Sequence, residues 1–252
     1  MRSPCPTPVT GRVDCSADVL PLRLLALCCL VLAVLCPGFE ALAAGGPQIV
    51  DDSEVETPGV CHLETWATRF IPGDGYFNIA PACTTLKIPW LEVGAAYQHY
   101  WDDLIAGPLL GPALKVNLQS VEKTGLGIGI GFNSGVNVVT GELGYAQALA
   151  LVTYQLTESV RLSFNAGWSY LQSDVPHALF YGAQVEASVG GGVSLMLEAF
   201  GRTQGGLVGT QAGLRYTPVI RGREPFDFDL LVGTFFDQTS TRFITLGVTV
   251  RY

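Results

Sequence analysis

The chain has 252 residues, of which 48% are hydrophobic and only 14% are charged, and its formal net charge at pH 7 is −8. This acidic balance, with lysines and arginines scattered along the chain, argues against a nucleic-acid-binding protein. From Leu86 onward no apolar stretch approaches the roughly 18 residues of a membrane-spanning helix, which excludes helical spans in this part of the chain.

Residues 1–43 have the features of a cleavable secretory signal. Basic residues precede the apolar run 24–36, and the small-x-small sequence Ala41-Leu-Ala43 follows it. The run is shorter than the ~20 apolar residues that a membrane-spanning helix needs. We therefore predict a signal peptide at 1–43, whose first 18 residues could be an upstream extension of the reading frame.

Cleavage would remove five of the seven cysteines and leave Cys61 and Cys83. A single cysteine pair in an exported protein predicts a disulfide, and closing this loop should contribute roughly 3 kcal/mol of stability. His62 is adjacent, but no third and fourth ligand stand at usable spacing, so neither a metal site nor a cofactor is predicted.

Residues 44–85 are rich in Pro, Gly, Asp and Glu and show no sustained hydrophobic period. We expect them to form an irregular periplasmic arm that the disulfide holds together. The membrane-embedded part would then begin at residue 86.

From Leu86 to Tyr252, strand-length segments with a two-residue period recur between turn residues. In 159–170, for example, Val160, Leu162 and Phe164 alternate with polar residues, so that one face of a strand would be apolar. Segments of about ten residues with this period are typical of strands that cross hydrocarbon at a tilt. The pattern predicts ten strands: 86–98, 112–122, 124–132, 144–156, 159–170, 178–189, 193–203, 206–216, 226–236 and 243–252.

The lengths of the connections give an independent indication of topology. With both termini in the periplasm, turns should alternate between long outer and short periplasmic ones. The connections 100–108, 133–141 and 172–177 are long, while 123–124, 157–158 and 190–192 are short; 217–225 does not fit. An all-β, antiparallel up-and-down barrel with an even strand count follows, with ten expected and eight or twelve left open.

The two faces of these strands differ in polarity. One carries Val, Leu, Phe, Trp and Tyr and is nearly free of charge, which suits lipid, with aromatics near strand ends as in interfacial girdles. The other would line the lumen, with acids and bases in equal number. The predicted lumen-lining residues are Glu92, Lys115, Asn117, Gln119, Arg161, Asn165, Glu186, Glu198, Arg202, Arg215, Asp227, Asp229 and Arg251.

The last strand carries the most specific pattern. Leu246, Val248, Val250 and Tyr252 fall on one face and alternate with small or polar residues. On this pattern the stretch 86–252 resembles bacterial outer-membrane β-barrel proteins and, loosely, small outer-membrane transporters named for the phenol-degradation meta pathway. The resemblance implies residence in the outer membrane, contact with its lipid, and recognition of these four residues by the barrel-assembly machinery.

The function is less specified than the fold. A narrow channel or transporter for small solutes is the leading hypothesis, and a structural or adhesive barrel with a filled lumen is the alternative. Gly125, Gly127, Gly129 and Gly131 would leave room along one wall, either for a path or for packing of the arm.

An outer-membrane enzyme is the third hypothesis. None of His62, His99 and His177 is followed two residues later by the serine that barrel lipases and deacylases use. The cluster from His99 to Asp103 has no partner that would position a general base. We therefore predict that the protein is not an enzyme.

Overall fold

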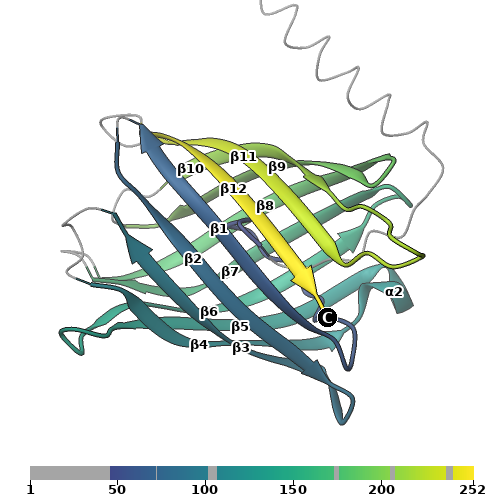
Figure 1. Ribbon diagram of the computed structural model, residues 1–252, viewed down its shortest axis with the longest axis horizontal. Coiled ribbons are helices and arrows are strands. Elements are labelled where there is room, and N and C mark those ends of the chain that lie inside the picture. The colour runs from purple at the N-terminus through teal and green to yellow at the C-terminus, as the bar shows by residue number, and fades with distance from the viewer. Residues whose placement is uncertain (1–45, 72, 102–106, 173–175, 205–207, 237–240) are drawn as a thin grey trace, which may run out of the picture.

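The computed structural model describes residues 46–71, 73–101, 107–172, 176–204, 208–236 and 241–252. Twelve strands and one short helix form these parts of the chain (Figure 1). They are β1 (Cys61–Ile71), β2 (Gly75–Thr85), β3 (Ile88–Tyr100), β4 (Leu109–Gln119), α2 (Val121–Thr124), β5 (Leu126–Asn137), β6 (Leu143–Gln155), β7 (Val160–Leu171), β8 (His177–Gly190), β9 (Val193–Arg202), β10 (Val208–Tyr216), β11 (Phe226–Phe235) and β12 (Arg242–Arg251).

The strands form one closed barrel in which each strand pairs antiparallel with the next and β1 pairs with β12. The predicted fold class is confirmed, and the strand count is twelve, the larger of the two alternatives left open, rather than ten. The ten predicted strands correspond to β3–β12. Closure leaves the sheet without a free edge, as a membrane-spanning sheet requires.

The prediction of an irregular arm is wrong for residues 61–85, which form β1 and β2 of the barrel. On β1 the inward His62 and Glu64 alternate with less polar outward residues, but Arg69 on the outward face interrupts this pattern. Backbone pairing with β12 and β2 holds β1 in place instead. The predicted disulfide is present and joins Cys61 to Cys83, which lie directly opposite each other on β1 and β2.

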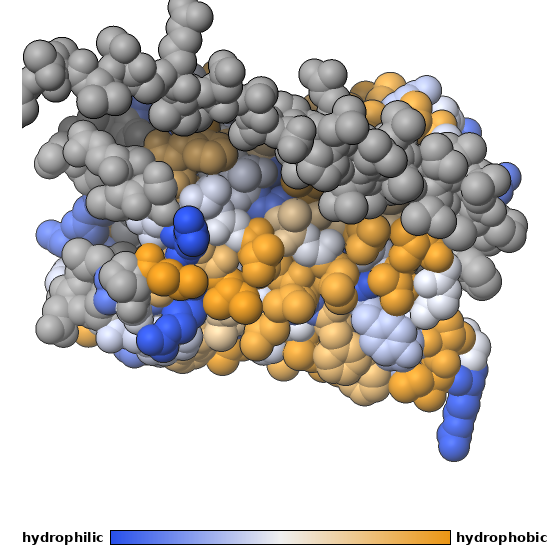
Figure 2. Space-filling model, turned by 90° about the horizontal axis from the view of Figure 1, so that it is seen from above, coloured by the Kyte–Doolittle hydropathy of each residue, from blue (hydrophilic) through white to orange (hydrophobic). Residues whose placement is uncertain are grey.

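The outer surface of the barrel is apolar and its interior is polar. On β7, Phe164 and Trp168 are more than 40% exposed, whereas Arg161, Ser163 and Asn165 are buried. Figure 2 shows hydrophobic side chains gathered across one face of the barrel. This distribution is that of a bacterial outer-membrane barrel, with lipid outside and polar groups within.

The described residues include no helix that is long and apolar enough to span a membrane.

The two ends of the barrel differ in their connections. The end that carries Cys61 and Tyr252, here called the C-terminal end, has short links between β2 and β3, β6 and β7, and β8 and β9, while the β10–β11 link is long, as its sequence indicates. At the opposite end, the loop expected from Asn133 begins only after Asn137, because β5 extends further than predicted, and Ser134 is buried. Asp102, Asp103 and Asp174, expected in outer loops, lie outside the described residues.

Candidate functional site: the barrel lumen

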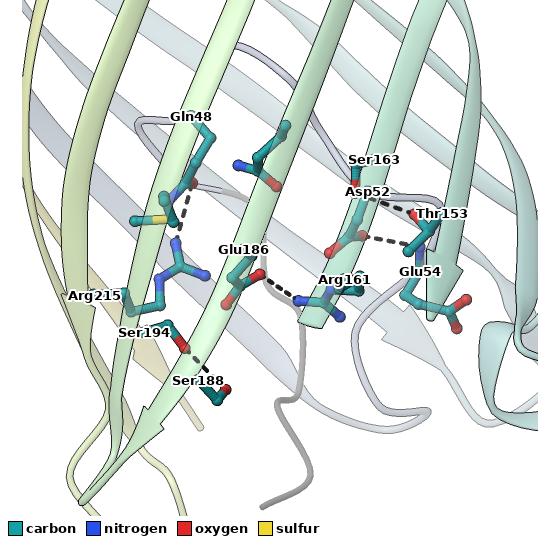
Figure 3. A network of polar contacts seen from close by, with 12 residues as sticks. Gln48, Asp52, Glu54, Thr153, Arg161, Ser163, Glu186, Ser188, Ser194 and Arg215 are labelled. Carbon is teal, nitrogen blue, oxygen red and sulfur yellow. Dashed lines mark hydrogen bonds and ion pairs between the residues drawn. The ribbon is translucent and has the colours of Figure 1, made fainter. Parts of the chain in front are cut away.

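Residues 46–60, here called the lumen segment, lie inside the barrel except at the exposed turn 57–59, and they lead into β1. The segment does not form a strand, so its backbone groups need partners on the wall. Glu198 of β9 accepts hydrogen bonds from the backbone amides of Ile49 (3.0 Å) and Val50 (3.4 Å). Gln48 reaches the neighbouring strand β10, where its side-chain oxygen accepts a hydrogen bond from the Arg215 guanidinium at 3.1 Å (Figure 3).

The middle of the segment is fixed by β4, β6 and β7. Asn165 accepts a hydrogen bond from the Asp51 amide (2.8 Å) and donates one to the Asp51 carbonyl (2.7 Å). The Asp51 carboxylate also forms an ion pair with Lys115 at 2.8 Å. The Ser53 amide donates to the Thr153 hydroxyl at 2.9 Å. The segment is therefore held by directed hydrogen bonds rather than by general packing alone.

The last part of the segment runs toward the C-terminal end. Glu54 accepts a hydrogen bond from the backbone amide of Val121, the first residue of α2, at 2.8 Å. The Glu56 carboxylate pairs with Arg251 at 2.8 Å, and its amide donates to Glu92 at 2.8 Å. Two predicted lumen residues from distant strands therefore meet on the segment.

Glycines of the wall make room for the lumen segment. A Cβ at Gly127 would overlap the Ser53 hydroxyl, and one at Gly182 would lie 2.6 Å from a Val50 methyl carbon. Of the two roles predicted for the alternating glycines of β5, packing of the N-terminal chain holds at Gly127 and Gly129, while Gly131 faces Leu151 at 3.4 Å. Gly125 instead ends α2 with φ +75°, a left-handed conformation that suits glycine.

The strands β8–β12, with the end of β7, form a closely filled wall, here called the packed wall. Arg215 pairs with Asp229 at 2.8 Å, and Arg251 pairs with Asp227 at 2.6 Å. Both carboxylate side chains are at most 1% exposed. Removing one partner of such a pair leaves a buried charge without compensation.

Further from the C-terminal end, aromatic side chains fill the same side. Val50 packs with Phe180, Phe200 and Phe243 in a buried cluster, and Phe70 and Phe235 lie against it. The rings of Phe235 and Phe243 are 5.1 Å apart. The lumen segment therefore stands between an ion-paired layer and an aromatic layer.

The opposite side of the lumen is hollow. A cavity of about 350 Å³ lies beside the lumen segment and is lined by inward residues of β1–β10. Its wall on β2–β5, here called the cavity wall, carries small inward side chains: Ala80, Ala82, Ala96, Ala113 and Gly131. The lining extends from Glu92 and Arg161, near the C-terminal end, to Tyr145 and Leu171, near the opposite end. The small size of these inward side chains therefore leaves room for the cavity.

The charge of the lumen is more acidic than the sequence prediction of equal acids and bases. The lumen segment adds Asp51, Asp52, Glu54 and Glu56, and β1 adds Glu64. Burial raises the pKa of the Asp52 carboxyl above its ordinary value, and the nearby Lys115 opposes this rise. The interior thus holds more carboxyl groups than cationic side chains.

The predicted lumen residues are buried or partly buried, and only some of them line the cavity. Glu92, Lys115, Arg161, Asn165, Glu186 and Arg215 line it. The predicted residues that are buried are Lys115, Arg161, Asn165, Glu186, Glu198, Arg202, Arg215, Asp227 and Asp229, and those that are partly buried are Glu92, Asn117, Gln119 and Arg251.

Among the cavity residues that were missed are Glu64 and Trp66 of β1. A period of two over 62–68 puts His, Glu, Trp and Thr on one face, and this signal could have identified them.

The histidines considered for catalysis lie among aromatic rings. His99 packs against Phe77 with ring centres 5.5 Å apart, and His177 stacks on Trp168 at 5.9 Å. In the described ranges no three His, Cys, Asp or Glu side chains are grouped so that they could hold a metal ion.

Comparison with known proteins places the chain in a family. The family model described as "Uncharacterised conserved protein UCP029691" matches residues 31–252, so the chain belongs to this family. No curated protein sequence matches the chain.

Among solved structures, the KdgM porin and the NanC porin each superpose with a TM-score of 0.57 at 6% identity. Each alignment covers 75% of this chain and 98% of the porin. At this identity the likeness establishes the fold, a barrel that is also used by porins.

Proposed function

We propose that this member of the family is an outer-membrane channel or transporter for small solutes. The observation that carries the proposal is the cavity of about 350 Å³, whose lining reaches from one end of the barrel toward the other. Twelve strands make the barrel wider than the eight-stranded barrels that inward side chains just fill, and the small residues along one wall leave part of this width open.

The chemistry of the cavity indicates a polar solute. Its lining includes Asn78, Gln147, Asn165 and charged groups, together with alanines. KdgM and NanC, which share this fold, are named porins, and this supports the same class of function. The looser resemblance to transporters of the phenol-degradation type also supports transport and assigns no solute. We propose no enzymatic activity.

Export and orientation belong to the same proposal. Residues 1–43 would direct secretion, and the C-terminal end of the barrel, with its short links, would face the periplasm. Leu246, Val248, Val250 and Tyr252 would be read by the barrel-assembly machinery. Leu246 is 60% exposed and Tyr252 71% exposed, so both side chains are accessible on the outer face.

A filled structural or adhesive barrel is the second candidate, and the lumen segment favours it. The segment fills the side of the lumen next to the packed wall and is bound to strands around the barrel. Under the first proposal the segment narrows the passage; under the second it completes the filling.

Conductance of the purified protein in a planar bilayer separates the two candidates. We expect discrete single-channel steps from the channel proposal, because the cavity is polar and lies beside the segment. Correctly folded barrel that shows no conductance would overturn the channel proposal and favour filling. Heat-modifiable gel migration provides the check on folding.

A cross-linked variant tests whether the segment must move. In Val50→Cys/Gly182→Cys, the sulfur at position 50 would stand near the place of a Val50 methyl carbon, which is 2.6 Å from a Cβ built at position 182. The two new thiols would therefore be within reach of a disulfide. If solutes pass beside the segment, oxidation leaves conductance unchanged relative to Val50→Cys alone. Loss of conductance on oxidation, restored by a reductant, would show instead that the segment leaves the lumen for transport.

A further inference from the structure

We propose that the lumen cavity binds a small organic ammonium ion, which Glu64 and Glu92 hold by charge and Trp66 by its aromatic face. The inference rests on the proposed function and deepens it, since it names the class of solute that the cavity would accept. It is argued from β1 and β3, where these three residues line the cavity.

Glu64 is the first observation. Its side chain is 10% exposed and lines the cavity, yet its Oε1 atom has no hydrogen-bond partner among the described residues. The imidazole of His62 has its Nε2 3.6 Å from Oε1, which is close enough for an ion pair when the ring is protonated but too long for a hydrogen bond. A buried carboxylate oxygen in this position costs free energy unless a cation or a donor meets it.

Glu92 supplies the second carboxylate. It lies on β3, and β2 between it and Glu64 presents only Ala80 and Ala82 to this part of the cavity. His62, which lies on the same inward face of β1 as Glu64, also lines this part of the cavity. Two acids that share one cavity favour a positive ligand between them.

The neighbouring cations of the lumen are already balanced by other acids. Lys115, opposite Glu92 on β4, lies 2.8 Å from Asp51 and 3.8 Å from Asp52. Arg161 lies 2.7 Å from Glu186. Each of these two cations therefore has an acid other than Glu64 and Glu92 as its nearest ion-pair partner.

Trp66 gives the site its selectivity for organic ammonium over a hydrated metal ion. It follows Glu64 by two residues and therefore lies on the same inward face of β1, where it lines the cavity. The face of a tryptophan is the best aromatic partner for a quaternary ammonium. A cavity of about 350 Å³ accommodates a molecule the size of choline.

Calorimetric titration of the folded protein in detergent with choline tests the inference. The neutral isostere 3,3-dimethylbutan-1-ol, which has the same shape without the charge, is the matched ligand control. We expect choline to bind and the isostere to bind at least about tenfold more weakly, because the charge would be what the carboxylates recognise.

The variants Glu64→Gln and Glu92→Gln should each weaken choline binding by about tenfold or more. Trp66→Leu should weaken choline binding while it affects the isostere less. Glu122→Gln is the matched control, since Glu122 is exposed on α2 and outside the cavity lining. Each variant is first shown to keep heat-modifiable migration, so that misfolding is not read as lost affinity.

Failure of this inference and failure of the proposed function give different results. Conductance without choline binding, equal binding of choline and its isostere, or full affinity in Glu64→Gln would overturn the ammonium site and leave the channel proposal standing. Choline binding that depends on Glu64 in a barrel without conductance would support the site and overturn the channel.

Discussion

The two sides of the lumen are built from the same kind of strand but with different inward side chains. On the packed wall, Leu231 and Asp227 are at most 1% exposed. On the cavity wall, the corresponding inward positions include Ala82 and Ala113. Backbone pairing is continuous around the barrel, so the sheet itself does not distinguish the sides. The size of the inward side chains and the position of the lumen segment together decide where the lumen is open.

The lumen segment lies along this boundary and contacts both sides. It uses hydrogen bonds and ion pairs with strands of both walls, and glycines such as Gly182 let it approach. Packed residues should therefore respond to substitution through stability, and cavity residues through binding and conductance.

The largest effect is expected from Arg215→Met on the packed wall. Asp229, whose side chain is 0% exposed, would lose its ion-pair partner, which should cost about 3–5 kcal/mol of unfolding free energy. Urea-induced unfolding of the folded barrel measures the loss. The double variant Arg215→Met/Asp229→Leu should recover much of this loss, because no unpaired charge remains. A loss below about 1 kcal/mol in the single variant would contradict a buried, closely packed ion pair.

Leu231→Ala tests packing on the same wall without a change in charge. Leu231 is 0% exposed, and removing its buried methyl groups should cost about 2–5 kcal/mol. Ala113→Val on the cavity wall should change the unfolding free energy by less than about 0.5 kcal/mol, because the added methyl groups enter the cavity. Similar losses in both variants would erase the distinction between the walls.

Gly127→Val tests the fit of the lumen segment. Its side chain would overlap the Ser53 hydroxyl, and overpacking of this kind typically costs about 1–3 kcal/mol. We expect the segment to shift, so that limited proteolysis cleaves within residues 46–60 faster than in the unchanged protein. Gly131→Ala is the control, because a Cβ there meets its nearest neighbour, Leu151, at 3.4 Å. Unchanged cleavage in Gly127→Val would show that the segment is held independently of this glycine.

The sequence predicts the alternating part of the barrel well and its N-terminal part poorly. Strands such as β7 and β12 alternate because one face meets lipid and the other polar groups, and this signal is local. β1 takes its position from pairing with β12, which is almost at the other end of the chain. The alternation of one strand contains no information about such a partner.

The site was predictable to a similar degree. Inward charges such as Lys115 and Glu186 follow from strand register, and the disulfide follows from cysteine usage. The ion-pair partners of these charges do not follow from the strand register. The partner of Lys115, for example, is Asp51, which lies on a segment that has no strand pattern. The glycines of β5 indicated spare room, but only the structure shows that Ser53 occupies it.

The central claim is that solutes pass along the cavity wall. Single-channel conductance of Ala113→Cys, before and after a positively charged methanethiosulfonate reagent, tests it most directly. Cys61 and Cys83 are joined in a disulfide and should not react. Thr245→Cys on the packed wall, where Thr245 is 2% exposed, is the matched control.

We expect the reagent to lower the conductance of Ala113→Cys, because the added group would lie in the passage, and to leave Thr245→Cys unchanged. Conductance of Ala113→Cys that is unaltered after complete modification, verified by mass, would contradict a path along the cavity wall.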